Sequence, residues 1–518
     1  MAIEDCREMS IPIYPNHEHA CPNVGNCPHL GGASVISVAM VANQSEDTRE
    51  SSLRQIRLLE KRNSELLSDV VSLQEQLERV KLELKIERQN KFATNEQSDD
   101  DAKPELQEAN QDDSGRKAKR GAPVGHPGWF RKTPQEYDWD IDVKAPRVCP
   151  CCASRQVILL DADPLEHLQE DIVDGQFRVV LYRHVVAKCI ACDTLVQKAG
   201  PGEVLGSRIG PGLRSKAIYL RNVIGITYRK VPRAIEELFG ITFTAAALIG
   251  FEKALAKLAE PVVDDIAKKL ASTDGPVYAD ETYWTLDGDR AYFWVHGNEQ
   301  FIHFTFETTR AGFVSRDVLG PDFCGTLVTD CYGGYNAQVA GAKQKCLAHL
   351  ARTSRDWQKL VAPVSADYQF FEDVKQFVQR GTRLHRRRKA GKLKGAALES
   401  EILWLRNELE RLSLTDVEDE KAIQLQGRIL RHLSEWLVFI DDPRVSPTNN
   451  LAERAIRPLV VLRKICFGSR SREGGERMAD LMSVAETARR HGHRASDIYY
   501  GLFTRPPDEV LRSLYAPA

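Results

Sequence analysis

The run from residue 277 to residue 330 constrains the fold of this chain more than any other segment. VYADET leads into YWTLDGDRAYFWVHG, in which an Asp-Gly pair at 287–288 separates two stretches rich in β-branched and aromatic residues. This pattern predicts two antiparallel strands joined by a tight turn. FIHFTFET gives a third alternating stretch, RAGFVSRDVLG has a helical pattern, and TLVTD is a short apolar strand. The run therefore predicts three antiparallel strands, a helix and a fourth strand.

Three separated carboxylates accompany this pattern. Asp280 lies within the first strand and Asp330 at the end of the fourth. Glu453 lies in TNNLAERAIR, where Thr448 or Asn449 can cap a helix and Glu453 falls about one turn inside it. Acids that converge in a fold can hold two Mg²⁺ ions about 3.5–4 Å apart, which clamp the attacking and leaving oxygens of a phosphodiester. Each acid alone is more often a solvated turn residue, so the prediction depends on the three together.

Glu473 and Glu476 are alternative third acids. They flank Gly474 and Gly475, which predict a mobile loop near phosphate. A preorganised metal site needs ligands on rigid elements, so Glu453 is the preferred assignment.

This order of strands, helix and acids resembles the ribonuclease H-like core of transposases and integrases, in which the third acid sits on a later helix. Longer motifs resemble transposases of the insertion sequence 66 family, over roughly residues 50–505. The resemblance implies a DDE-type transposase that uses two Mg²⁺ (or Mn²⁺) ions per active site, and it aligns Asp280, Asp330 and Glu453 with the catalytic triad. The motifs are Gly-His-Pro-Gly at 125–128, CLAHLARTSRD at 346–356, NNLAERAIRPLVVLRK at 449–464 and the GS…GGER…ETAR string at 468–489.

The implied partners are double-stranded DNA, both as terminal inverted repeats and as target, and small accessory proteins encoded by the same element. Activated water would cut one strand at each element end, and the freed 3′-hydroxyl would attack target DNA without a covalent protein intermediate. Two rival functions stay open. One is a catalytically silent, repressor-like DNA-binding dimer, and the other is a nuclease that cleaves without joining.

Polar residues around the acids are candidates for supporting roles. Asn449 and Asn450 lie one turn before Glu453 and are candidates to orient it. His349 follows the second acid in sequence and is either a packed histidine or a contact to DNA or the scissile phosphate.

Three cations follow Glu453 along the same predicted helix. Arg457 lies one turn after it, and Arg463 and Lys464 come next, so all three are candidates to neutralise DNA phosphates. Pro458 predicts a break or kink in this helix, which would place Arg463 and Lys464 on a different face from Arg457.

Two C-x-x-C pairs, Cys149 with Cys152 and Cys189 with Cys192, predict a four-thiolate Zn²⁺ site. FRVVLYRHVVAKC between them predicts the strands of a zinc ribbon. The expected role is structural, with redox chemistry as the weaker alternative, and Cys151 is an extra thiol inside the first pair.

The N-terminal region predicts an association module. Residues 53–88 repeat apolar residues at spacings of three and four with Asn63 at an a position, which predicts a parallel dimeric coiled coil; the alternative is a helix packed on its own domain. In GAPVGHPGWFRKTP, Trp129 with Arg131 and Lys132 either grips DNA or packs on a neighbouring domain. The first 48 residues contain five possible metal ligands whose spacing matches no known zinc motif. Zinc binding and a flexible leader therefore both stay open for this segment. The five residues are His17, His19, Cys21, Cys27 and His29.

Composition adds the compartment and the charge pattern. The formal net charge is −2, so the whole-chain charge does not indicate nucleic-acid binding, but basic runs at 116–120 and 383–394 are candidate backbone contacts. The chain shows no apolar run near 18 residues and no signal peptide, which predicts a cytoplasmic, nucleoid-associated bacterial protein without a membrane partner. In that compartment, 12 cysteines favour metal binding or burial over disulfides.

The expected fold is a multidomain α+β and α/β protein. Its ribonuclease H-like mixed sheet carries a helical insertion and is preceded by a coiled coil, a zinc ribbon and a helical DNA-binding region that includes a candidate helix-turn-helix. The expected segments are a Cys/His-containing leader at 1–48, a coiled coil at 49–90, a disordered linker at 91–120, a Gly-His-Pro-Gly segment at 121–146, a zinc ribbon at 147–200, a helical DNA-binding region at 201–272, a catalytic core at 273–470 with the insertion at about 360–440, and a helical tail at 471–518.

Overall fold

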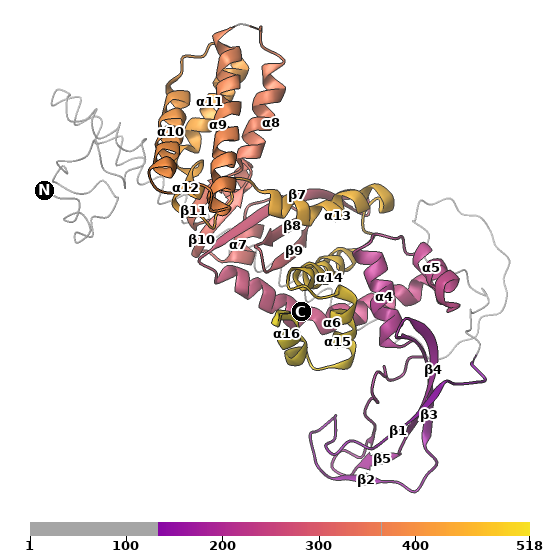
Figure 1. Cartoon of the computed structure of the whole chain (residues 1–518). Helices are drawn as coiled ribbons and strands as arrows, with labels where there is room; N and C mark the ends of the chain where they lie inside the picture. Colours follow the sequence, from indigo (N-terminus) through magenta and orange to yellow (C-terminus); the bar gives the residue numbers. More distant parts are fainter. Residues whose placement is uncertain (1–132, 364, 518) are drawn as a thin grey trace, which may run out of the picture. The chain divides into compact units, whose positions relative to one another are not determined.

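The computed structural model describes residues 133–363 and 365–517. The predicted leader, coiled coil and linker lie outside the described residues, as do Trp129, Arg131 and Lys132. Three sheets and a larger number of helices make up the described part, which is a mixed α/β protein (Figure 1). No helix in this part is long and apolar enough to cross a membrane.

The cysteine-rich region forms two small sheets. One joins β2 (Val157–Leu159), β5 (Ala187–Cys189) and β6 (Leu195–Val196), and of the four paired cysteines only Cys189 lies in its strands. The other joins β1 (Trp139–Val143), β4 (Gln176–His184) and β3 (Leu165–Val173). FRVVLYRHVVAKC does not lie in one ribbon, as its pattern predicts, but divides between β4 of one sheet and β5 of the other.

Three helices follow, as predicted: α4 (Pro211–Asn222), α5 (Lys230–Phe239) and α6 (Ala245–Ala271). Gly240 ends α5 in the left-handed conformation, at φ 70°, where a side chain would be strained. A recognition helix must keep one face free for DNA, whereas α6 buries residues along most of its length. The helix-turn-helix assignment of α5 and α6 stays a prediction.

The central sheet has the order β11-β10-β7-β8-β9. The three antiparallel strands, the helix and the fourth strand predicted from the sequence are all present, and β10 runs parallel to β7. Asp287 and Gly288 both have positive φ, as a two-residue hairpin turn of this type requires. The elements are β7 (Pro276–Leu286), β8 (Asp289–Gly297), β9 (Ile302–Glu307), α7 (Phe313–Leu319), β10 (Phe323–Thr329), a 3-10 turn η2 (Gly333–Tyr335) and a further parallel strand, β11 (Ala340–Lys345).

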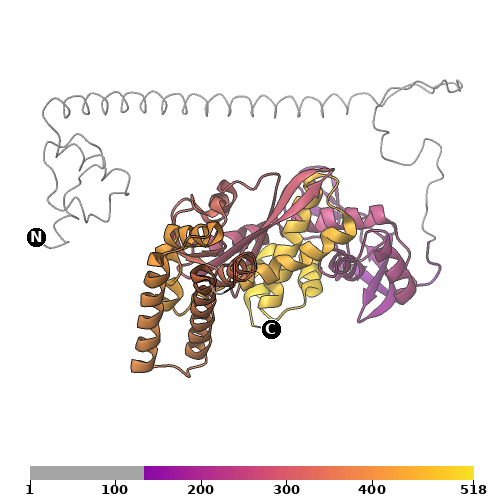
Figure 2. The same cartoon turned by 90° about the horizontal axis from the view of Figure 1, so that it is seen from above.

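Residues between the sheet and the next long helix are helical, as the predicted insertion requires. In Figures 1 and 2 the longer of these helices lie roughly side by side. Apolar side chains of this region, including Phe371 and Trp436, join Phe293 and Val295 of β8 in one core. The insertion therefore shares its core with the sheet. Its elements are α8 (Leu347–Gln358), α9 (Ala366–Lys389), α10 (Gly395–Leu414), α11 (Glu420–Arg431), the 3-10 turn η3 (Leu433–Glu435) and α12 (Val438–Asp441).

Alternation along the strands gives the sheet two cores, because successive side chains point to opposite faces. Phe293 and Val295 pack with the insertion and α13 (Asn450–Cys466), whereas Trp294 packs on the other face with α4, α6 and the C-terminal helices. The predicted helical tail is present as α14 (Arg472–Arg490), α15 (Ala495–Thr504) and α16 (Pro507–Tyr515).

Helix α14 corrects one expectation. Gly474 and Gly475 do not form the mobile loop that their sequence predicts but lie in the first two turns of this helix, and Ser471 caps it through the Gly474 N–H. A Cβ on Gly475 would lie 2.5 Å from the Phe306 ring, so close packing against β9 explains the glycine.

The edge strand β9 is closed by α14. The Phe304 N–H donates to Ser483 Oγ at 2.8 Å, and the Ile302 N–H donates to Thr487 Oγ1 at 3.1 Å. Side-chain hydroxyls thus replace the missing neighbour strand on the buried edge.

We expect Ser483→Ala to destabilise the protein by about 1–3 kcal/mol, because it leaves the buried Phe304 N–H without its acceptor. Urea unfolding followed by circular dichroism measures the change. Ser400→Ala, at an exposed position of α10, is the control and should stay within about 0.5 kcal/mol of the parent. Equal stability of the two variants would contradict the role given to Ser483.

Candidate active site

Asp280 lies in the middle of β7, between β10 and β8. Its Oδ1 accepts a hydrogen bond from the Glu281 N–H at 3.0 Å. Burial, together with the negative charges of Glu281, Asp330 and Glu453, raises the pKa of Asp280 to about 8. The two predicted partner acids thus lie close enough for their charges to act on Asp280.

Asp330 directly follows β10, as predicted. In the parallel pairing Val328 is opposite Tyr278, so two further residues along each strand bring Asp330 level with Asp280. The Tyr332 N–H donates to Asp330 Oδ1 at 2.8 Å, which fixes this carboxylate at the strand end.

Glu453 lies in the first turn of α13, which packs against β7 and β8. The start of this helix is fixed by Asn449, whose Nδ2 donates to the Ala279 carbonyl at 2.7 Å. Asn449 is the N-cap residue, but its side chain bonds β7 and does not make the capping bond that the sequence predicts. Asn450 is exposed, so its predicted part in orienting Glu453 finds no support in its position.

His349, at the start of α8, joins the acids. Its Nδ1 lies 3.5 Å from Glu453 Oε1. Three buried atoms here have no hydrogen-bond partner within the described residues: Glu453 Oε1, His349 Nδ1 and Asn449 Oδ1. Buried polar atoms are rarely left unsatisfied in native proteins, so this cluster is suited to bind a further group.

The alternative third acids are engaged elsewhere. Glu476 Oε1 accepts from Arg472 Nε at 2.7 Å. The charge of Glu453 contributes to the raised pKa of Asp280, which favours Glu453 as the third acid.

A basic cavity of about 330 Å³ adjoins Asp330 and His349. Arg310 lies over the Tyr332 ring at 3.8 Å, with its Nε bonded to Glu281 Oε1 at 2.8 Å. The sequence did not reveal the cavity's cations, because they come from segments far apart in the chain. These are Arg310 from the loop after β9 and Arg428 and Arg431 from α11.

The cations predicted after Glu453 lie along α13. The helix continues through Pro458 to Cys466, so the predicted break is wrong. Arg457 and Lys464 are exposed, and Arg463 reaches back to donate to the Tyr283 carbonyl of β7.

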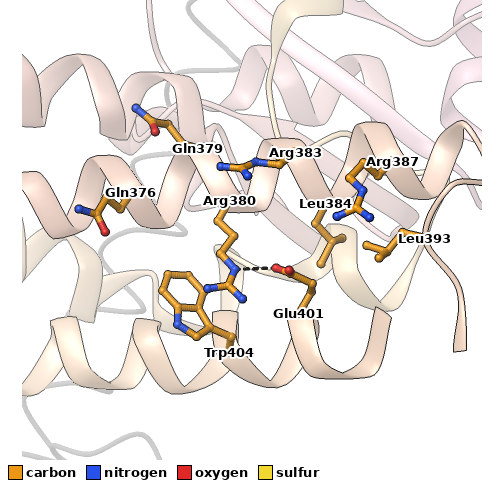
Figure 3. Close-up of a pocket in the computed structure, with 9 residues that line it drawn as sticks. All are labelled: Gln376, Gln379, Arg380, Arg383, Leu384, Arg387, Leu393, Glu401 and Trp404. Carbon is orange, nitrogen blue, oxygen red and sulfur yellow. Dashed lines mark hydrogen bonds and ion pairs between the residues drawn. The ribbon is translucent and has the colours of Figure 1, made fainter. Parts of the chain in front are cut away.

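A second basic surface lies on the insertion, within the predicted run at 383–394. Arg380 stacks over the Trp404 ring at 4.0 Å, and its Nε bonds Glu401 Oε2 at 2.6 Å (Figure 3). Arg383 and Arg387 line the same pocket from exposed positions on α9.

The four predicted zinc ligands also come together. The Sγ atoms of Cys149, Cys152, Cys189 and Cys192 all lie within 4.8 Å of one another. Cys151 is exposed and is not part of this group.

Comparisons with known proteins show the family of this chain. The family model described as "Transposase IS66 family" matches residues 206–477, just over half of the chain and including all three acids. The uncharacterized protein y4hP of Sinorhizobium fredii is 24% identical over 469 residues, covering 79% of this chain and 83% of that protein. The uncharacterized protein y4qI of the same organism is 24% identical over 406 residues, covering 68% and 69%. The chain therefore belongs to the IS66 family of transposases.

Proposed function

We propose that this transposase cuts and joins DNA ends at a DDE site formed by Asp280, Asp330 and Glu453. The observation that carries the proposal is that the charges of Asp330 and Glu453 both act on the buried Asp280. The parallel pairing of β10 with β7 and the basic cavity that Asp330 lines support it. The strand order, with three antiparallel strands and two parallel ones, supports a ribonuclease H-like core.

The donor set fits Mg²⁺ or Mn²⁺. The three residues offer carboxylate oxygens, which hard divalent cations prefer, and Glu453 Oε1 is buried without a hydrogen bond among the described residues. The raised pKa of Asp280 reflects burial and negative charge that the protein leaves uncompensated. When bound, two such ions would activate the attacking oxygen and stabilise the leaving oxygen of a phosphodiester.

The remaining residues bind and position the DNA. Arg428 and Arg431 offer cationic charge next to Asp330, where the scissile phosphate must lie. Asn449 acts as a positioning residue, because its amide links α13 to the residue before Asp280. Water attacks first, and the freed 3′-hydroxyl then attacks target DNA. Neither step requires a covalent protein intermediate.

The cysteine group supports a structural Zn²⁺ site. Four thiols of suitable mutual distance match the donor set of a closed zinc site, which stabilises a small domain with little core of its own. We also propose that the protein dimerises through residues 53–88 and acts on element ends and target DNA, with accessory proteins from the same element.

The rival functions differ in what the site must do. A silent, repressor-like dimer needs neither the three acids nor the unsatisfied oxygens between α13 and β7. A nuclease would share the whole site and differ in the second step. An assay that follows both cleavage and strand transfer on labelled element ends separates all three.

We expect Glu453→Gln to abolish cleavage and joining while folding and end binding stay intact, because the neutral amide is a poor ligand for a hard cation. Glu473→Gln and Glu476→Gln are the matched controls and should keep measurable activity. Gel assays with Mg²⁺ measure cleavage, and gel shifts in Ca²⁺ measure binding. Near-parental cleavage by Glu453→Gln would contradict the assignment.

For the insertion, we expect Arg383→Ala with Arg387→Ala to weaken DNA binding alike for all sequences. The slope of log affinity against log salt should become shallower by about one for each DNA phosphate that the variant no longer binds. Arg406→Ala is the control, since this exposed arginine of α10 is already paired with Asp441 at 2.8 Å. An unchanged salt slope in the double variant would rule out phosphate binding here.

Metal analysis tests the cysteine site. We expect the full chain to hold about one Zn²⁺, and Cys189→Ser to lose it and to lower the melting temperature. Cys151→Ser should keep the metal, because this thiol lies outside the group. Full zinc content in Cys189→Ser would exclude the four-cysteine site.

A further inference from the structure

A second and larger groove lies away from the three acids. Its volume is about 880 Å³, and it is bounded by α4, the loop before α5, α6, the end of α13, the start of α14 and the loop between these last two helices. The groove is strongly basic, with Glu473 as the single acid among its lining residues. The cations that line it are Arg221, Arg229, Lys253, Arg470 and Arg477.

Phe467 is an unusual residue to find in this groove. It is 81% exposed, although a large apolar ring is normally buried. It ends α13 in the left-handed conformation, with φ 59° and ψ 14°, a position that usually goes to glycine. A bulky residue held in a strained and exposed position points to a role in binding.

The loop that carries Phe467 is held rigidly against β7. The Ser469 N–H donates to the Thr285 carbonyl at 2.8 Å, and Trp284 Nε1 donates to Ser469 Oγ at 3.0 Å. A Cβ on Gly468 would lie 2.3 Å from the Thr285 carbonyl oxygen, so the backbones meet directly. The ring is therefore presented by the same strand that carries Asp280.

Two arginines in the groove have unused donors. Arg221 is 3% exposed and lies over the Tyr228 ring at 4.2 Å, yet its Nε and Nη1 have no hydrogen-bond partner within the described residues. Arg477 Nε is also buried without one. The nearby Glu252 attracts both charges, but its oxygens accept from Asn222 at 2.8 Å and Tyr228 at 2.6 Å.

We propose that this groove binds one unpaired nucleotide of the DNA end, with its base stacked on Phe467 and its phosphate bound by Arg221 and Arg477. An aromatic ring can stack on any base, but only where the base face is not covered by its neighbours in the duplex. The proposal rests on the function proposed above, since it names a further contact to the same DNA.

Strand geometry sets where this nucleotide lies. Thr285 is five residues beyond Asp280 on β7, which is about 17 Å at the rise of a strand. That span corresponds to about five base steps of duplex DNA. The unpaired nucleotide is thus expected within about five base pairs of the cut.

The test uses the full chain and element-end duplexes with one mismatch placed in turn at each of the first eight positions. We expect the parent to bind one mismatched duplex about tenfold more tightly than the paired duplex, because that base is already free to stack. Phe467→Ala should lose this preference, and Phe467→Trp should keep it. Leu414→Ala, which removes another exposed apolar side chain on α10, is the matched control.

A second measurement replaces the same base by 2-aminopurine, whose fluorescence changes when it leaves the duplex stack. The change should disappear in Phe467→Ala and stay in Leu414→Ala. A mismatch preference that survives in Phe467→Ala would overturn the inference while cleavage of element ends still supports the proposed function. If the parent neither binds nor cleaves DNA ends, both proposals fail.

Discussion

The hydrogen bond from the Asn449 amide to the Ala279 carbonyl is the interaction on which the site's geometry depends. It joins residues 170 positions apart and fixes the first turn of α13 to the middle of β7. Asp280 is the next residue on one side of this bond, and Glu453 is one turn along on the other. The Asn449 N–H also donates to Cys346 Sγ, which brings the start of α8 and its His349 into the same cluster. One buried amide thus sets the relative positions of groups from three elements.

Much of the central sheet could be predicted from sequence because its strands alternate on two buried faces. Asp330 stands out there as the lone charge that ends an apolar strand, whereas Asp280 shares its strand with a neighbouring acid, Glu281. The strand β11 could not be predicted, because AGAKQK has no apolar alternation and its buried Lys345 bonds Thr329 Oγ1 at 3.2 Å. The sequence pattern does not show that Thr329 bonds the buried Lys345. It does not show the arginines of the cavity either, because charged residues on a helix normally indicate a solvated face. The loop predicted at Gly475 was wrong for a related reason. This glycine packs closely on Phe306, and such a tertiary contact is not visible in the local sequence.

Charge explains why the helical insertion is placed between the second and third acids. The carboxylates repel one another, and burial adds to the free-energy cost of ionising Asp280. The insertion contributes Arg428 and Arg431, which line one cavity together with Asp330. The carboxylates and these arginines therefore come from parts of the chain that share one hydrophobic core.

The two ends of the insertion meet, since the Leu347 N–H donates to the Pro447 carbonyl at 2.8 Å. The segment from Leu347 to Pro447, which contains α9 and α10, therefore begins and ends at the same place. The exposed turn at 390–392 lies in the middle of this segment in sequence, and the end of α9 before it returns to α12, where Arg388 Nη1 donates to the Ile440 carbonyl at 2.6 Å. A break in the backbone at this turn would cut no strand of the sheet and no link between the acids. The polypeptide is therefore suited to being divided there into two fragments that reassemble through their common core. Bringing the two fragments together would then give a way to control the protein's activity.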